Sequence, residues 1–225
     1  MKQQVKTKQR VAEFGEVLTA EREVKAMCDL VKQETERIDS RFLEPACGDG
    51  NFLAEILERK LAVVKRKYKR SQLDYEINAI LAISSIYGVD ILIDNAIACR
   101  ERLFKIWDKE YVTVCKKRCR TDTREAAKFI LSRNIICGNA LTLMCVDDKG
   151  QDTNEPIVFS EWAFIKGTQM QRKDYSFAEL LCVADQNEEI KETCQMNLFA
   201  NEDGEVEPTF LKQYISDYRR VQNNE

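Results

Sequence analysis

The residues with the clearest chemical potential lie between Glu44 and Gly50, in the string Glu-Pro-Ala-Cys-Gly-Asp-Gly. An apolar pair, Phe42 and Leu43, precedes this string, and a helical pattern follows it from Asn51. Two glycines separated by one residue let the backbone turn sharply and approach a ligand without a Cβ in the way. The order of strand, glycine turn and helix start is typical of loops that hold nucleotide-like ligands at the carboxyl edge of a parallel sheet.

Two common glycine-loop ligands are disfavoured by the surrounding residues. A dinucleotide site requires a third glycine near Leu53 and an acid about 20 residues further on, and the chain has neither. A phosphate loop requires a Gly-Lys-Ser/Thr string, which does not follow the glycines. A bare Gly-x-Gly also fits an ordinary turn between a strand and a helix, so the identification depends on the rest of the pattern.

Two later segments place polar residues where further parallel strands should end. The run from Tyr87 to Ile91 reads as a short buried strand that ends in an acid, Asp90. An acid at the tip of the second strand is placed to accept hydrogen bonds from both ribose hydroxyls of an adenosyl group. The segment 134–141 reads as a third buried strand whose exit carries Asn139.

Taken together, these segments resemble the S-adenosylmethionine motifs of the adenine-N6 DNA methyltransferases, the group that includes the M subunits and fused methylases of restriction–modification systems. The strings that carry the resemblance are Glu44 to Gly50, Gly88-Val-Asp-Ile and Gly138-Asn-Ala-Leu, and the similarity spans about 11–141. The resemblance implies S-adenosyl-L-methionine as cofactor and a Rossmann-like α/β methyltransferase fold.

The resemblance also implies roles for individual residues. The loop backbone and Glu44 would hold the amino-acid end of the cofactor, Asp90 the ribose, and Asn139 the adenine amine. Thr19 matches the Phe-Thr-Pro motif that usually precedes the glycine loop, although Leu18 and Ala20 replace its aromatic residue and proline. The implied cofactor-lining positions are Thr19, Glu44, Pro45, Ala46, Cys47, Gly48, Asp49, Gly50, Asn51, Phe52, Asp90, Ile91, Asn139, Ala140 and Leu141.

The catalytic signature of this family is missing. An adenine amine is a poor nucleophile, and the family activates it with an Asn/Asp-Pro-Pro-Tyr loop that receives the flipped base. The chain has three prolines, Pro45, Pro156 and Pro208, and no Pro-Pro pair. No catalytic residue is therefore assigned.

A missing fourth strand suggests an incomplete fold. In the family sheet the fourth strand pairs beside the first, so its absence would expose a strand edge and the faces of a parallel sheet. The simplest hypothesis is a split enzyme, in which a second methyltransferase subunit completes the fold, carries the catalytic motif and recognises double-stranded DNA. Two alternatives stay open: a non-catalytic S-adenosylmethionine-binding regulatory or structural module, and a methyltransferase for a non-DNA acceptor.

Composition excludes several other classes. The 225 residues are 44% hydrophobic and 32% charged, which suits a globular domain. No apolar run approaches the ~20 residues that span a bilayer and no signal peptide is evident, so a cytoplasmic protein without membrane contact is expected. The nine cysteines fit reduced thiols. The absence of histidine removes Ser-His-Asp and Cys-His chemistry, and no metal site is expected around the close pair Cys115 and Cys119.

The chain divides into four expected segments: a basic leader (1–14), a cofactor-binding domain (15–146), a β-hairpin extension (147–184), and an acidic linker with a C-terminal helix (185–225). Within the extension, 147–156 reads as a polar loop and 157–175 as the hairpin. Basic blocks occupy 59–70 and 100–133, although the net charge is only −3. They read either as solvated helix faces or as a surface that meets DNA backbone.

Overall fold

The computed structural model describes residues 19–186 and 210–224, so the expected basic leader and residues 187–209 of the acidic linker lie outside the described residues. The fold is mixed α/β, with a central sheet in the order β1-β2-β3-β4-β5. The strands are β1 (Phe42–Glu44), β2 (Ile86–Asp90), β3 (Ile135–Asn139), β4 (Met144–Val146) and β5 (Asp152–Pro156). Strands β1 to β3 are parallel, and β4 and β5 add antiparallel pairs at one side.

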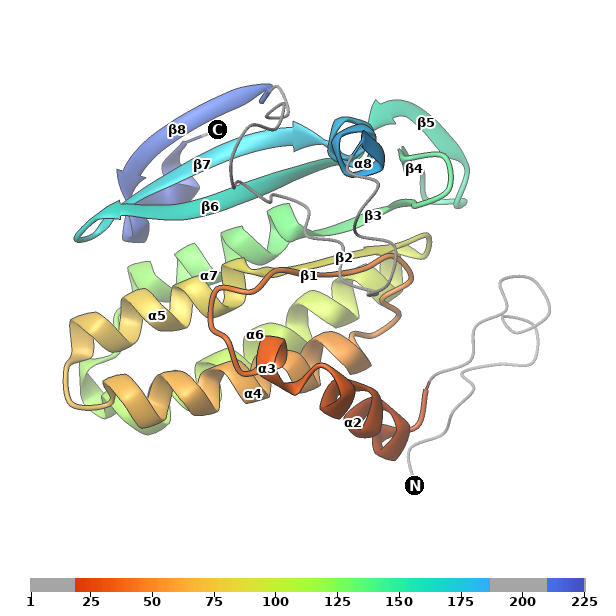
Figure 1. Ribbon diagram of the computed structural model, residues 1–225. Coiled ribbons are helices and arrows are strands. Elements are labelled where there is room, and N and C mark those ends of the chain that lie inside the picture. The colour runs from red at the N-terminus through yellow and green to blue at the C-terminus, as the bar shows by residue number, and fades with distance from the viewer. Residues whose placement is uncertain (1–18, 187–209, 225) are drawn as a thin grey trace.

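Four helices connect the parallel strands: α4 (Asn51–Tyr68), α5 (Gln72–Ser84), α6 (Ile93–Cys115) and α7 (Thr121–Asn134), with a 3-10 turn η1 (Lys116–Arg118) between the last two. Helices α5 and α7 run almost directly into β2 and β3, so they extend these strands end to end. Helices α4 and α6 return beneath them (Figure 1). Both return helices lie on one face of the sheet, as right-handed crossovers in the order β1-β2-β3 require.

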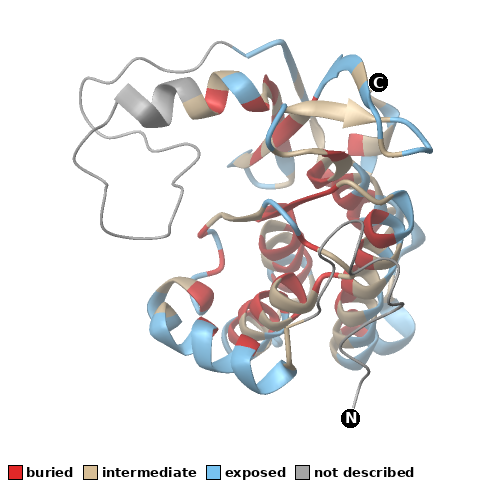
Figure 2. Ribbon diagram, turned by 90° about the vertical axis from the view of Figure 1, so that its right-hand side faces the viewer, coloured by how far each residue is buried: buried red, intermediate tan, exposed pale blue. Residues whose placement is uncertain are grey.

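The main core lies between these layers. Leu57, Leu61, Ile80, Trp107 and Ile130 are each completely buried in it. Helix α2 (Glu21–Leu30) and the short α3 (Lys32–Thr35) pack against α4. Figure 2 shows buried residues gathered between the helices and along the strands, with exposed residues on the outer faces. None of the helices in the described ranges is both long and apolar enough to cross a membrane.

A second sheet covers the other face of the central sheet. It contains β6 (Val158–Lys166), β7 (Gln169–Ser176) and β8 (Lys212–Asp217), all antiparallel, and helix α8 (Phe177–Gln186) follows β7. Strands β6 and β7 form the expected hairpin. Tyr87 and Val89 of β2 pack against Ile157, Phe159 and Phe177 to form a second buried cluster. This face is therefore covered by the chain itself, and a partner is not needed to cover it.

The outer edge of β1 differs from that face. Among the described residues, β1 pairs only with β2. An open edge next to the first strand was one of the two reasons for expecting a partner subunit, and this reason still holds for the part of the chain that the structure describes.

Two expected elements are wrong. Residues 210–224, the described part of the segment for which a C-terminal α-helix is expected, form no α-helix, because 212–217 form β8 and 218–223 form a 3-10 helix, η2 (Tyr218–Asn223). Apolar residues at 210, 214, 215 and 218 fit a helical period, but in the structure 212–217 pair with β7 at the edge of the second sheet. The polar loop expected over 147–156 also contains a strand, since β5 pairs with β4 although its side chains are largely exposed.

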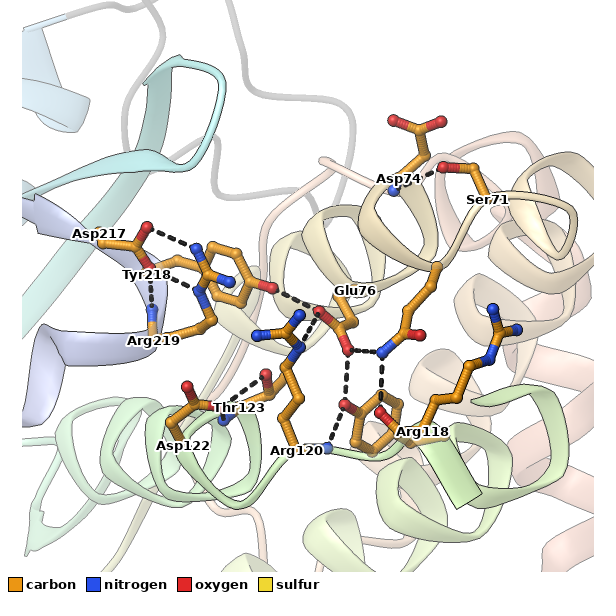
Figure 3. A network of polar contacts seen from close by, with 12 residues as sticks. Ser71, Asp74, Glu76, Arg118, Arg120, Asp122, Thr123, Asp217, Tyr218 and Arg219 are labelled. Atoms are coloured by element: carbon orange, nitrogen blue, oxygen red, sulfur yellow. Dashed lines mark hydrogen bonds and ion pairs between the residues drawn. The ribbon is translucent and has the colours of Figure 1, made fainter. Parts of the chain in front are cut away.

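A buried carboxylate anchors η2 to the helices (Figure 3). Glu76 of α5 is only 1% exposed. Its two oxygens accept hydrogen bonds from the hydroxyls of Tyr111 (2.6 Å) and Tyr218 (2.7 Å), and from the Gln72 amide (2.8 Å). The Tyr111 oxygen in turn accepts the Arg120 backbone N–H at 2.9 Å. Burial raises the pKa of both tyrosines, so their hydroxyls remain donors.

Candidate ligand-binding site at the glycine loop

The glycine loop and the two later polar segments meet at one edge of the sheet. Glu44 is level with Gly88, and Asp90 is level with Cys137, in neighbouring parallel strands. The carboxyl ends of β1, β2 and β3 therefore lie side by side, and this edge is where ligands bind in open α/β sheets. The structure thus brings together the loop after Glu44, Asp90 and the exit of β3 at Asn139.

Both glycines of the loop have left-handed backbones. Gly48 has a φ of 54° and Gly50 a φ of 83°, and Gly50 occupies the N-cap position of α4. A Cβ on Gly50 would lie 2.7 Å from the Cys99 sulfur, so a larger residue would require the Cys99 side chain to move. The loop is also tied to the sheet by a hydrogen bond from the Cys47 N–H to the Val89 carbonyl (2.9 Å). Glycine is needed here for both conformation and space.

Asp90 holds the loop against the next strand. Its carboxylate is 8% exposed and accepts hydrogen bonds from the Gly48 N–H (2.9 Å), the Leu92 N–H (2.9 Å) and the Asn95 amide (3.1 Å). A carboxylate offers about four acceptor positions, so roughly one remains. A ligand diol that donated hydrogen bonds to both carboxylate oxygens of Asp90 would have to displace one of these three donors or share an acceptor position with it.

Arg102 is a contributor that the sequence reasoning missed. Its Nη1 donates to the Asn51 side-chain oxygen at 2.6 Å and to an Asp49 carboxylate oxygen at 3.2 Å. The Asn51 amide in turn donates to the Thr19 carbonyl at 3.4 Å, which brings the segment before α2 next to the loop. The sequence did contain a signal for this role, because Arg102 lies on the same side of α6 as the buried residues Cys99 and Leu103. A charged side chain on the buried side of a helix needs a polar partner.

The exit of β3 forms its own turn. The Asn139 side-chain oxygen accepts the Leu141 N–H at 3.0 Å, and its amide donates to Asp152 at 3.1 Å. Ala140 packs partly against the second buried cluster, whereas Leu141 is 94% exposed. The Asn139 side chain would have to exchange a contact before it could bond an adenine amine.

The remaining expected positions surround the loop. Pro45 and Ala46 are exposed, and Phe52 and Ile91 are half-buried. Burial raises the pKa of Glu44, and a hydrogen bond from the Ala46 N–H opposes this shift. A partly buried carboxylate with a raised pKa is stabilised in its charged form by a ligand cation such as an ammonium or sulfonium group.

Thiol and metal chemistry receive no support at this edge. A hydrogen bond with the Cys99 thiol and burial raise the pKa of Cys47, which disfavours its reactive thiolate form. Both cysteines are buried beneath the loop. Within the described residues, no group of His, Cys, Asp or Glu side chains has the arrangement that could hold a metal ion. What the edge offers is backbone N–H groups, carboxylates and a half-buried apolar rim, which suits binding of a polar organic ligand.

A scan against protein-family models, a search of curated proteins and a search of solved structures each found no match to this chain.

Proposed function

We infer that the chain is the S-adenosylmethionine-binding subunit of a split adenine-N6 DNA methyltransferase, of a restriction–modification or related system, whose catalytic motif is supplied by a partner chain. The observation that carries this proposal is the bond between Asp90 and the Gly48 N–H, which joins the expected ribose ligand to the expected cofactor loop. This bond joins two residues that are 42 positions apart in the sequence.

Two further features support the proposal. Glu44 carries a partly buried carboxylate at the loop, where the cofactor's ammonium group would lie. The outer edge of β1 lacks a strand partner among the described residues, and this is the position that the missing fourth strand would occupy. The partner would supply that strand together with the base-binding loop.

A second candidate function is a non-catalytic S-adenosylmethionine-binding module. The observation in its favour is the cover that β6 and α8 provide over the upper face of the sheet, because the chain then needs no partner to bury that face. Such a module would bind the cofactor alone and would change conformation or partner affinity without transferring a methyl group.

Calorimetry with S-adenosylmethionine tests the pocket common to both functions. We expect binding by the wild type and at least tenfold weaker binding by Asp90→Asn, because an amide in place of the carboxylate loses acceptor positions toward both Gly48 and the ribose. Asp148→Asn, the same change at an exposed carboxylate in the β4–β5 turn, should leave the affinity unchanged. Absence of wild-type binding would end the proposal.

Transfer of a labelled methyl group to duplex DNA then separates the two functions. For the split enzyme, label should enter adenine N6 only when the chain is co-expressed with its native partner, identified by co-purification. Transfer by the isolated chain would contradict the split, and cofactor binding without transfer in any mixture would favour the module.

A further inference from the structure

The end of the helical layers far from the glycine loop carries a concentration of exposed cations. These residues, here called the basic end, are Arg66, Lys67, Lys69, Arg70, Lys116, Lys117, Arg118 and Arg120. They come from two separate segments, the junction of α4 with α5 and the junction of α6 with α7. Helix α4 has 18 residues and begins at the glycine loop, so at about 1.5 Å per residue the basic end lies roughly 27 Å away.

Hydrogen bonds hold the two segments together as one surface. The Gln72 amide at the start of α5 donates to the Arg118 carbonyl at 2.8 Å. The Arg120 N–H donates to the buried Tyr111 hydroxyl at 2.9 Å. Figure 3 shows the Arg120 side chain turned toward Glu76 and Tyr218, with Arg118 on the other side of this network. The backbone that presents these cations is therefore fixed by the core.

The charge of the basic end is largely unneutralised. Within the described ranges, Arg120 is the only one of the eight in an ion pair, at 4.0 Å from Glu76. Nearby acids are engaged elsewhere, since Glu110 pairs with Lys65 at 3.0 Å and Asp108 with Arg124 at 2.6 Å. Three further acids lie near this end: Asp74 and Glu125 are exposed, and Asp122 is half-buried in the first turn of α7. In a chain of net charge −3, this is a marked local excess of positive charge.

Helix C-termini account for part of the arrangement. Cations near a helix C-terminus interact favourably with its dipole, which explains Arg66, Lys67 and the C-cap residue Lys69 of α4, and the C-cap residue Lys116 of α6. The other four cations lie beyond these caps. Helices α5 and α7 begin at this end while α4 and α6 finish there, so the helix dipoles largely offset one another and the side chains set the local potential.

We propose that the basic end is a docking surface for the phosphate backbone of duplex nucleic acid. An extended polyanion is the partner that matches eight cations spread over two joined segments. Single strands are disfavoured because they are held by stacking on exposed aromatic rings. Tyr111 is fully buried and Tyr68 packs on the core, so neither ring is free to stack.

The proposal does not rest on the cofactor pocket. Contacts to phosphates carry no sequence information, so the surface would position a duplex and leave base recognition to other residues. Because it lies far from the glycine loop, nucleic acid bound there and a small ligand bound at the loop do not compete for the same groups.

Fluorescence anisotropy with a labelled 20-base-pair duplex tests the surface. We expect the full chain to bind with an affinity that falls with salt, with a slope of about −0.9 per phosphate contact. Lys69→Glu/Arg70→Glu and Lys117→Glu/Arg118→Glu should each weaken binding at least tenfold and flatten the slope. The control, Lys166→Glu/Lys212→Glu, makes the same charge change at exposed positions of the second sheet and should change affinity less than threefold.

Three outcomes would overturn the proposal: no duplex binding at low salt, equal losses in the control and the patch variants, or tighter binding to single strands or anionic vesicles than to the duplex. Thermal melting shows whether each variant is folded. Calorimetry with S-adenosylmethionine on the patch variants should match the wild type. If the chain bound the duplex but not S-adenosylmethionine, the proposed function would be wrong and the docking-surface proposal would still hold.

Discussion

Asp90 and Glu76 are both buried carboxylates, but their surroundings differ in a way that separates a site from a structural anchor. Asp90 lies at the carboxyl edge of the sheet, and its donors are two backbone N–H groups and one amide within or beside adjacent loops. Glu76 lies among the helices, and two of its donors are tyrosine hydroxyls from α6 and η2. One carboxylate shapes a loop that solvent and ligands can reach, whereas the other joins distant parts of the chain.

This difference shows why burial alone does not identify function. Both acids accept several hydrogen bonds, and both are nearly inaccessible. What distinguishes Asp90 is its partner, since Gly48 has a left-handed backbone in a loop that precedes a helix. The predictions below test whether Glu76 acts globally and Asp90 locally.

The largest effect is expected at Glu76. Glu76→Ala leaves two buried tyrosine hydroxyls without their acceptor, and each buried unsatisfied group costs about 1–3 kcal/mol. The Gln72 amide keeps its second acceptor, the Arg118 carbonyl. We expect a loss of about 4 kcal/mol in the free energy of unfolding, measured by urea denaturation. Glu125→Ala, at an exposed position of α7, should change it by less than about 0.5 kcal/mol. A small loss at Glu76 would show that water replaces its contacts.

A smaller and more local effect is expected at Asp90. Asp90→Ala removes the acceptor of the Gly48 N–H, and because water can reach this edge we expect a loss of about 2 kcal/mol. Hydrogen exchange should accelerate at Gly48 and Leu92 while the amides of α5 keep their protection. Asp148→Ala serves as the matched control. Uniform acceleration across the chain would contradict a local role for Asp90.

A buried lysine, Lys60, extends the comparison to a basic side chain. Lys60 donates to the Ile38 carbonyl (3.2 Å), the Ser40 carbonyl and the Ser85 hydroxyl (2.6 Å), none of them charged. Burial lowers the pKa of Lys60 to about 7. Its ordinary pKa is about 10.4, so between these values the unfolded chain binds one more proton and stability rises with pH.

The expected slope is up to about 1.4 kcal/mol per pH unit between pH 7 and 10. The free energy of unfolding of Lys60→Met, measured by urea denaturation over this pH range, should have a slope lower than that of the wild type by this amount. The other titrating groups are common to both proteins, so their contributions to the slope are the same. Equal slopes would mean that the lysine keeps its proton in the folded state.

The smallest effect is expected at Tyr218. Tyr218→Phe removes one donor to Glu76 and keeps the ring, so we expect a loss of about 1 kcal/mol by thermal or urea denaturation. Tyr214→Phe in β8, whose ring lies 4.3 Å from the Arg172 guanidinium, should cost less because that contact needs no hydroxyl. If Tyr214→Phe lost more free energy of unfolding than Tyr218→Phe, the C-terminal segment would be held mainly by β8 rather than by η2.

Local patterns determined much of the fold and the candidate loop. The glycine spacing, the acid at the end of the second strand and the helical periods between them indicated the α/β order and the positions of β1, β2 and β3, because these signals depend on neighbouring residues alone. The hairpin of β6 and β7 followed from the same kind of signal. The conformation of residues 210–221 could not be predicted in this way, because their apolar spacing suits a helix as well as an edge strand.

Only the tertiary structure decided how distant groups are paired. Nothing in the sequence shows that Glu76 meets Tyr218 or that Arg102 reaches Asp49, because these contacts join residues 142 and 53 positions apart. Likewise, the second sheet covers the central sheet because its apolar residues complement Tyr87 and Val89 in space. The sequence determined most of the strands, helices and glycine turns, because these depend on neighbouring residues. Long-range packing determined the conformation of the C-terminal segment and which distant side chains contact one another.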